Sequence, residues 1–225
     1  MGKLHSDSAD KAEILNSQFT SVFTSDISDP NANTVTEGPS IPSIQDIIFV
    51  EEGICDLLKA VKPKKAHGPD HLPCRLLHEL AEELAPVLTD IFQRSYDSGT
   101  LPNVWRSANV SPIYKKGPVC EPANYRSVSL TCVPSKLMEH VLCSQLRAHF
   151  DQFSALTPLN HGFRSKHSCE TQLLLTTHDF MVSLSKPRAQ VDVAVLDFSK
   201  AFDKVPHARL MSKLRLMGIH GKTSQ

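Results

Sequence analysis

The chain has 225 residues, 40% of them hydrophobic, which is enough to bury a core in one domain or one and a half and excludes a disordered tail. Its 24 lysines and arginines balance 24 aspartates and glutamates, so a net charge of zero excludes a global attraction to nucleic acid or acidic membranes, and any such contact requires a local patch. No apolar run approaches the roughly 20 residues of a membrane span and the start, MGKLHSDSAD, lacks the apolar core of a secretory signal, so we expect an intracellular protein, cytoplasmic or nuclear, without membrane contact.

The first expected element is an amphipathic helix that starts at Asp10. Its apolar side chains recur at spacings that put them on one helical face: Leu15, Phe19, Val22 and Phe23. Residues 24–43 are rich in Ser, Thr, Pro and Asn and lack a sustained period, which indicates a linker. We therefore assign residues 1–43 to an N-terminal helix and linker.

Helices dominate the next stretch. Residues 51–61 form an amphipathic pattern that Pro63 ends, and a turn follows at residues 67–70. After Pro73 a leucine-rich stretch predicts two packed helices, the second beginning at Pro86, because proline is tolerated in the first helical turn.

Two short β-branched segments, residues 110–117 and 125–131, are bounded by Pro and Gly and predict a hairpin. Between Trp105 and Arg126 the sequence holds four basic residues and one acid, Glu121. This is a local basic patch within a neutral chain. The alternative is a solvated hairpin with ordinary surface lysines.

Further helices are expected from Pro134, from Ser168 and from His207, the last ending at Gly218. Between the last two, residues 191–198 (VDVAVLDF) alternate with period two and predict a strand whose valine-rich face ends in Asp197. The six cysteines are scattered, with no Cys-x-x-Cys pair, and predict free thiols.

Asp197 is the candidate catalytic acid, and Asp203 is a second acid in the turn that follows the expected strand. A carboxylate at the end of a strand is well placed to hold a divalent metal, and phosphoryl-transfer polymerases use such acids to hold two ions. One aspartate alone cannot hold two ions. The alternative is that Asp197 caps the strand and Asp203 caps the last helix.

Several segments resemble, in order and spacing, the reverse transcriptases of non-LTR (LINE-type) retrotransposons. They are KKAHGPDHLPCRLL from Lys64, WRSANVSPIYKKG from Trp105, NYRSVSLT from Asn124, SKLMEHVL from Ser135, NHGFRSKHSCETQLL from Asn160 and LDFSKAFDKVPH from Leu196. The resemblance covers residues 12–221, and the motifs are specific together although each alone is weak.

The resemblance implies roles for individual residues. Asp197 would be the catalytic residue and a ligand of both Mg²⁺ (or Mn²⁺) ions, assisted by the carbonyl of Phe198. Phe202 would be the steric gate that excludes a ribose 2′ hydroxyl, unless it simply packs in the core. The expected nucleotide-binding residues are Lys115, Lys116 and Arg126, together with Phe198 and Phe202. The expected template-binding residues are Gly68, Asp70 and Arg164.

The sequence also departs from the family pattern. Where the family usually has glycine, proline and glutamine, this chain has His71, Ser127 and Asn160. No Ala-Asp-Asp turn follows Asp197 within the 225 residues, so we expect a fragment that ends before the active site is complete and does not polymerise alone.

The sequence therefore predicts an α+β fold, a partial right-hand polymerase with helix-rich fingers, a basic hairpin and the first strand and helix of the palm. Fingers are expected at residues 44–190 and the start of the palm at 191–225. The expected function is RNA-directed DNA polymerase by family, with an RNA template, a DNA primer and deoxynucleoside triphosphates as partners. The alternative is a non-enzymatic nucleic-acid-binding or interaction protein derived from the fingers.

Overall fold

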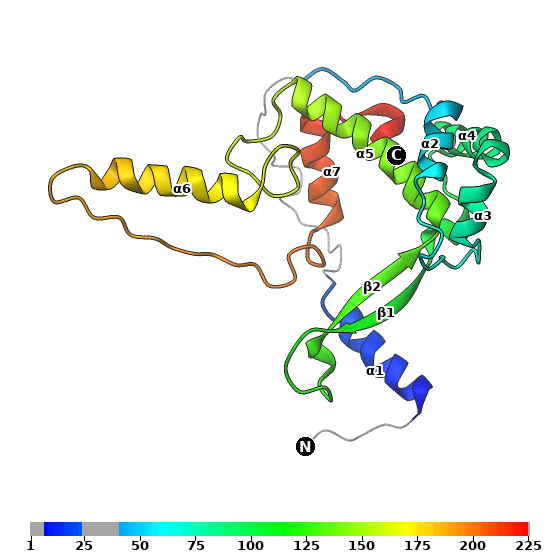
Figure 1. The fold of residues 1–225 in the computed structure, drawn as a ribbon, viewed down its shortest axis with the longest axis horizontal. Helices are drawn as coiled ribbons and strands as arrows, with labels where there is room; N and C mark the ends of the chain where they lie inside the picture. Colours follow the sequence, from blue (N-terminus) through cyan, green and yellow to red (C-terminus); the bar gives the residue numbers. More distant parts are fainter. Residues whose placement is uncertain (1–6, 24–40, 225) are drawn as a thin grey trace.

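The computed structural model describes residues 7–23 and 41–224 (Figure 1). Its elements, in chain order, are α1 (Ser8–Thr20), α2 (Glu51–Lys59), α3 (Cys74–Glu79), α4 (Ala81–Ser98), β1 (Ala108–Tyr114), β2 (Tyr125–Thr131), α5 (Val133–Gln152), α6 (Cys169–Leu184) and α7 (His207–Leu216), with short 3₁₀ turns η1 (Asn103–Arg106), η2 (Pro122–Asn124) and η3 (Gly221–Ser224). The expected helices and the expected hairpin are confirmed.

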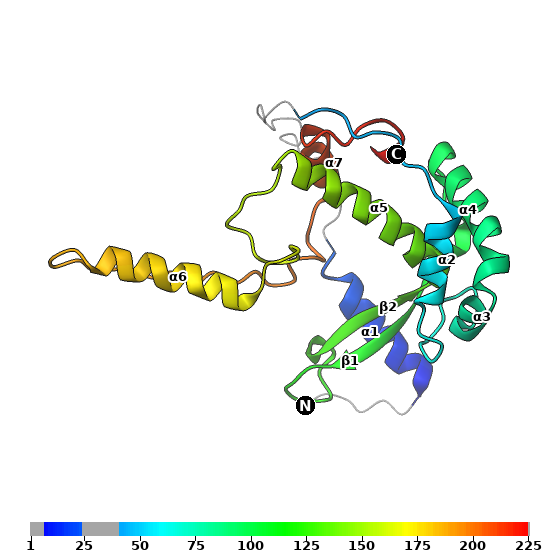
Figure 2. The same cartoon turned by 45° about the horizontal axis from the view of Figure 1, so that its top comes forward.

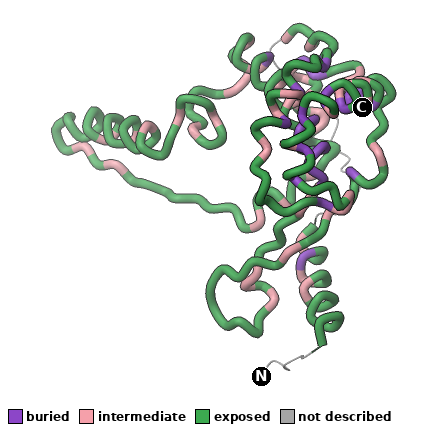
Figure 3. The backbone as a smooth tube through the Cα atoms, turned by 45° about the vertical axis from the view of Figure 1, so that its right-hand side comes forward, coloured by how far each residue is buried: buried purple, intermediate pink, exposed green. Residues whose placement is uncertain are grey.

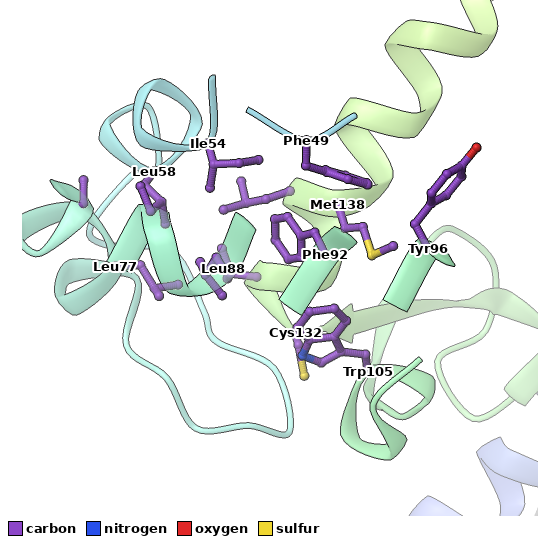
Figure 4. Packing of buried hydrophobic residues seen from close by; sticks show 14 of the residues in the cluster. Phe49, Ile54, Leu58, Leu77, Leu88, Phe92, Tyr96, Trp105, Cys132 and Met138 are labelled. Atoms are coloured by element: carbon purple, nitrogen blue, oxygen red, sulfur yellow. The ribbon is translucent and has the colours of Figure 1, made fainter. Parts of the chain in front are cut away.

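The core lies in a helical body formed by α2, α3, α4 and the first half of α5. Ile54 and Leu58 of α2 are one turn apart and both are buried, so α2 presents one apolar stripe to α4. Phe92 of α4 is fully buried, and its ring lies 5.6 Å from that of Trp105 and 5.7 Å from that of Phe49 (Figure 4). Trp105 is thus a core residue of the body.

One detail of the body differs from the prediction. The break between α3 and α4 lies at Leu80, and Pro86 lies inside α4 rather than at its start. Pro86 and Glu82 are both exposed. Since proline has no N–H, the Glu82 carbonyl loses its usual intrahelical donor on the solvent-exposed side of α4, where that loss is least costly.

The hairpin projects from the body (Figure 1), and β2 leads almost directly into α5. β1 and β2 are antiparallel, with Ala108 opposite Thr131 and Tyr114 opposite Tyr125. A view turned by 45° shows α1 lying beside the strands (Figure 2), and Phe19 is the residue that α1 buries.

Residues 169–206, which we call the arm, lie apart from the body. They comprise α6 and the chain that returns alongside it (Figure 1). Ser168 caps α6 in a capping box with Thr171, but α6 contains no buried residue, and the arm is almost entirely exposed in Figure 3.

The expected strand at residues 191–198 is wrong for this structure, which has no regular secondary structure there. A strand needs a neighbour to pair its backbone N–H and C=O groups. The sheet of the described residues contains only β1 and β2, so the alternating segment has no partner.

After the arm the chain returns to the body through α7. Gly218 ends this helix with a positive φ of 83°, and its carbonyl accepts a 2.8 Å hydrogen bond from the Ile44 amide. Ile219 is buried. None of the described helices has both the length and the apolar character to cross a bilayer, and all six cysteines are free thiols.

Candidate functional site

The hairpin brings three of the expected nucleotide-binding residues to its loop end. Arg126 lies opposite Ile113 in the register of the strands. The Lys115 amide donates a 2.8 Å hydrogen bond to the Asn124 carbonyl, so Lys115 continues the ladder by one step. Arg126, Lys115 and Lys116 are all exposed, and the hairpin register gathers them.

Aromatic and amide side chains hold the loop beyond the strands. The rings of Tyr114 and Tyr125 meet at 5.7 Å. The Tyr125 hydroxyl donates to the Val119 carbonyl at 2.9 Å, and Asn124 Nδ2 donates to the Pro118 carbonyl at 2.9 Å. These bonds fix the backbone that carries the two lysines.

The positive charge of the hairpin is available to a ligand. Over the part of the chain that the structure describes, none of Arg106, Lys115, Lys116 and Arg126 forms an ion pair. Exposed cations without internal partners attract phosphate groups with little competition from the protein's own acids.

Gly68 and Asp70 lie in a turn that packs on the junction of β2 and α5. A Cβ at Gly68 would come within 2.4 Å of the Cys132 backbone nitrogen. Asp70 Oδ1 accepts from the Leu72 amide at 3.3 Å, while Oδ2 is buried and unpaired among the described residues. Burial raises the pKa of the Cys132 thiol. The backbone of the neighbouring Asp70 lowers this pKa, while the Asp70 carboxylate raises it. The turn therefore has a packing role, and its template contact stays a prediction.

Arg164 forms bonds within the protein. Its Nη1 donates to the Thr157 carbonyl at 3.2 Å and its Nη2 lies 3.5 Å from Asp151 Oδ1. The side chain is 19% exposed. It ties the loop before α6 to the end of α5, and a template contact again stays a prediction.

Asp197 lies on the exposed return chain of the arm, next to the 79% exposed Phe198. It forms no hydrogen bond or ion pair with the described residues. Those residues also contain no group of three His, Cys, Asp or Glu side chains that could hold a metal. Asp197 and the Phe198 carbonyl thus do not make a fitting site for two divalent ions in this arrangement.

Phe202 makes a contact that sequence reasoning missed. Its ring is 78% exposed and meets the ring of Phe163 at 5.8 Å and 85°. Phe163, in the HGFR segment, has a left-handed φ of 59°. Packing of Phe202 in the core is therefore wrong. Capping by Asp203 is also wrong, because Pro206 occupies the N-cap of α7.

Comparisons with known proteins agree on one family. Residues 113–224 match the family described as reverse transcriptase (RNA-dependent DNA polymerase). The chain is 30% identical over 165 residues to the RNA-directed DNA polymerase from mobile element jockey of Drosophila melanogaster, which covers 73% of this chain and 18% of that protein.

Two other relatives extend the comparison. The chain is 24% identical over 163 residues to a probable RNA-directed DNA polymerase from transposon X-element of Drosophila melanogaster, covering 72% of this chain and 18% of that protein. It is 29% identical over 127 residues to a retrovirus-related Pol polyprotein from the type-1 retrotransposable element R2 of Popillia japonica, covering 56% and 17%. The chain spans less than a fifth of the length of each of these relatives. It belongs to the reverse transcriptase family and is homologous to the polymerases of non-LTR retrotransposons.

Proposed function

We propose that this chain forms the fingers, at residues 44–190, and the start of the palm, at residues 191–225, of an RNA-directed DNA polymerase. In this proposal Lys115, Lys116 and Arg126 bind the phosphates of the incoming deoxynucleoside triphosphate opposite an RNA template. The observation that carries it is the cationic loop end of the hairpin, which is exposed and forms no ion pair with any residue that the structure describes, in a chain of zero net charge.

The chemistry of these side chains suits phosphate. The Arg126 guanidinium presents a planar fork that matches two phosphate oxygens, whereas Lys115 and Lys116 supply mobile point charges. Since the loop backbone is held by Tyr125 and Asn124, the lysines start from a fixed platform and lose less freedom on binding.

The roles of three residues of the arm form a separate proposal. We assign Asp197 as a metal ligand, with the Phe198 carbonyl, in a site that needs further carboxylates which the described residues do not bring to it. We assign Phe202 as the steric gate, because its exposed ring is available to lie under a sugar.

A binding experiment tests the hairpin. Fluorescence anisotropy of a labelled RNA–DNA primer–template would be compared for the chain and for a Lys115→Glu, Lys116→Glu, Arg126→Glu variant. We expect the variant to bind at least about tenfold more weakly and to lose part of its salt dependence, because fewer counterions are released. The matched control reverses Lys62, Lys65 and Lys136, which lie in the body. Equal losses in both variants would contradict the assignment.

A primer-extension assay tests the metal site proposed at Asp197. We expect the polypeptide of these 225 residues alone to add no nucleotide with Mg²⁺ or Mn²⁺, because two-ion catalysis needs more carboxylates than Asp197. Clear incorporation that is lost in Asp197→Asn would show that the polypeptide completes a site by itself.

A further inference from the structure

A surface cavity of about 390 Å³ lies on the body, and no residue of β1 or β2 lines it. It is bounded by the end of α2, the loop that follows, the start of α3 and the first half of α5. Its lining residues are Leu57, Ala60, Val61, Lys62, Lys65, Ala66, Cys74, Val133, Lys136, Leu137 and His140.

The walls are aliphatic and well packed. Leu137 and Val133 are buried and belong to the core cluster, and Leu57 and Val61 pack against that cluster. Cys74, 2% exposed, forms part of the wall, and its thiol donates to the Ala66 carbonyl at 3.7 Å. The cavity wall is therefore part of the hydrophobic core cluster, and its interior offers apolar contact.

The rim carries only positive charge. Lys62 and Lys65 reach it from the loop and Lys136 from α5, and all are exposed. In the described ranges, none of these lysines forms an ion pair, and no carboxylate lines the cavity. The acid next to His140, Glu139, instead accepts a 3.1 Å hydrogen bond from Ser135.

This combination favours one class of occupant. Nucleic-acid bases bind single-strand sites by stacking on aromatic rings, but His140 on the rim is the only ring in the lining. An aliphatic pocket instead takes a Leu, Ile or Met side chain, and a lysine rim pairs with flanking carboxylates. An acidic peptide therefore complements the positive charge of the rim.

We propose that this cavity docks an acidic peptide segment of a partner protein, with an apolar side chain inserted between α2 and α5 and carboxylates paired with Lys62, Lys65 and Lys136. This interaction does not depend on the hairpin or on Asp197. It would tether the polymerase to another protein while the hairpin stays free for nucleic acid.

The probe for the test is a short fluorescein-labelled peptide with a pair of leucines flanked on both sides by glutamates. Anisotropy would be measured with the full chain, with Lys62→Glu, Lys65→Glu, Lys136→Glu, and with Ala60→Leu, which fills the cavity without changing charge. We expect each variant to weaken peptide binding by about tenfold or more. Replacing the leucines of the peptide by serine is expected to weaken binding similarly.

The hairpin variant Lys115→Glu, Lys116→Glu, Arg126→Glu is the matched control and should bind the peptide like the unaltered chain. Since every altered side chain is exposed, circular dichroism should show the same fold in every variant. Equal binding of the serine peptide, or equal weakening by the hairpin variant, would overturn the proposal. So would displacement of the peptide by a single-stranded oligonucleotide that itself needs Lys62, Lys65 and Lys136 but is unaffected by Ala60→Leu. Loss of nucleic-acid binding by the hairpin variant alone bears on the proposed function and leaves this proposal intact.

Discussion

The helical body and the arm use apolar side chains in different ways. In the body, helices with one apolar stripe cover each other, so that Phe92 and Leu58 are fully buried. In the arm, Leu174 of α6 is 70% exposed and Val195 of the return chain is 89% exposed. Since burial of apolar area is the main stabilising term, the body should account for nearly all of the free energy of unfolding.

The largest expected effect comes from a matched pair of truncations. Phe92→Ala removes a fully buried ring between Phe49 and Trp105, and should lower the free energy of unfolding by about 3–5 kcal/mol. Leu174→Ala in α6 should change it by less than about 0.5 kcal/mol. Urea unfolding followed by tryptophan fluorescence measures both. Similar losses would mean that the arm also contributes to the stable unit.

A second pair tests the junction between the body and the hairpin. Gly68→Ala puts a Cβ 2.4 Å from backbone atoms of Cys132, so the turn or the start of α5 must move. We expect a loss of about 1–3 kcal/mol. Gly53→Ala in α2 meets nothing within 4 Å and should instead stabilise the helix by about 0.5–1 kcal/mol. Thermal unfolding would show opposite shifts, and shifts of the same sign would contradict the packing role of the turn.

The sequence also predicted the secondary structure of the body more accurately than that of the arm. Periodicity of 3.6 residues was sufficient to predict α2 and α5. Paired β-branched runs were sufficient to predict the hairpin, which carries both Lys115 and Arg126 near its loop end. The strand at residues 191–198 failed because alternation shows which side chains share a face but cannot supply a pairing strand. The predicted helix start at Pro86 failed because proline is favoured in the first helical turn but is not confined to it.

The contact between Phe163 and Phe202 shows the same limit of sequence patterns. Phe163 and Phe202 lie far apart in the sequence and share no periodic pattern, so their ring contact could be found only in three dimensions.

At position 71, by contrast, the sequence departure and the structure agree. The family usually has glycine there, and His71 adopts a left-handed φ of 54°, which explains that preference.

His71→Gly is accordingly expected to stabilise the body. Relief of the left-handed strain is worth about 1–2 kcal/mol and the added freedom of the unfolded chain offsets about half of it, leaving a gain of about 0.5–1 kcal/mol. Urea unfolding would measure the gain. The control is Ser127→Pro, the other family residue, which lies in exposed β2. A loss of stability in His71→Gly would mean that the ring contact of His71 with His67, at 5.5 Å, outweighs the strain.

The smallest effect concerns the chain that follows the arm. Lys222 Nζ lies 2.7 Å from Asp97 on α4 and 3.4 Å from Asp46. The hydrogen bond from Lys222 lowers the pKa of Asp97 below its usual 3.8, and the same bond raises the pKa of Lys222 above its usual 10.5. Both pairs are solvent-exposed, so the stabilisation is modest and screened by salt.

The sign of the pH dependence follows from these directions. The lowered pKa of Asp97 stabilises the fold above pH 3.8, and this contribution is lost as pH falls through the folded-state pKa. The raised pKa of Lys222 stabilises the fold below pH 10.5, and this contribution is lost as pH rises through the higher folded-state pKa. Lys222→Met should therefore reduce stability slightly between these limits and leave it unchanged in strong acid. Stability curves against pH, at low and high salt, would measure this, with Lys213→Met in α7 as the control. A difference between Lys222→Met and the unaltered chain that persists below the pKa of Asp97 would mean that Lys222 acts through packing of its methylene chain rather than through charge.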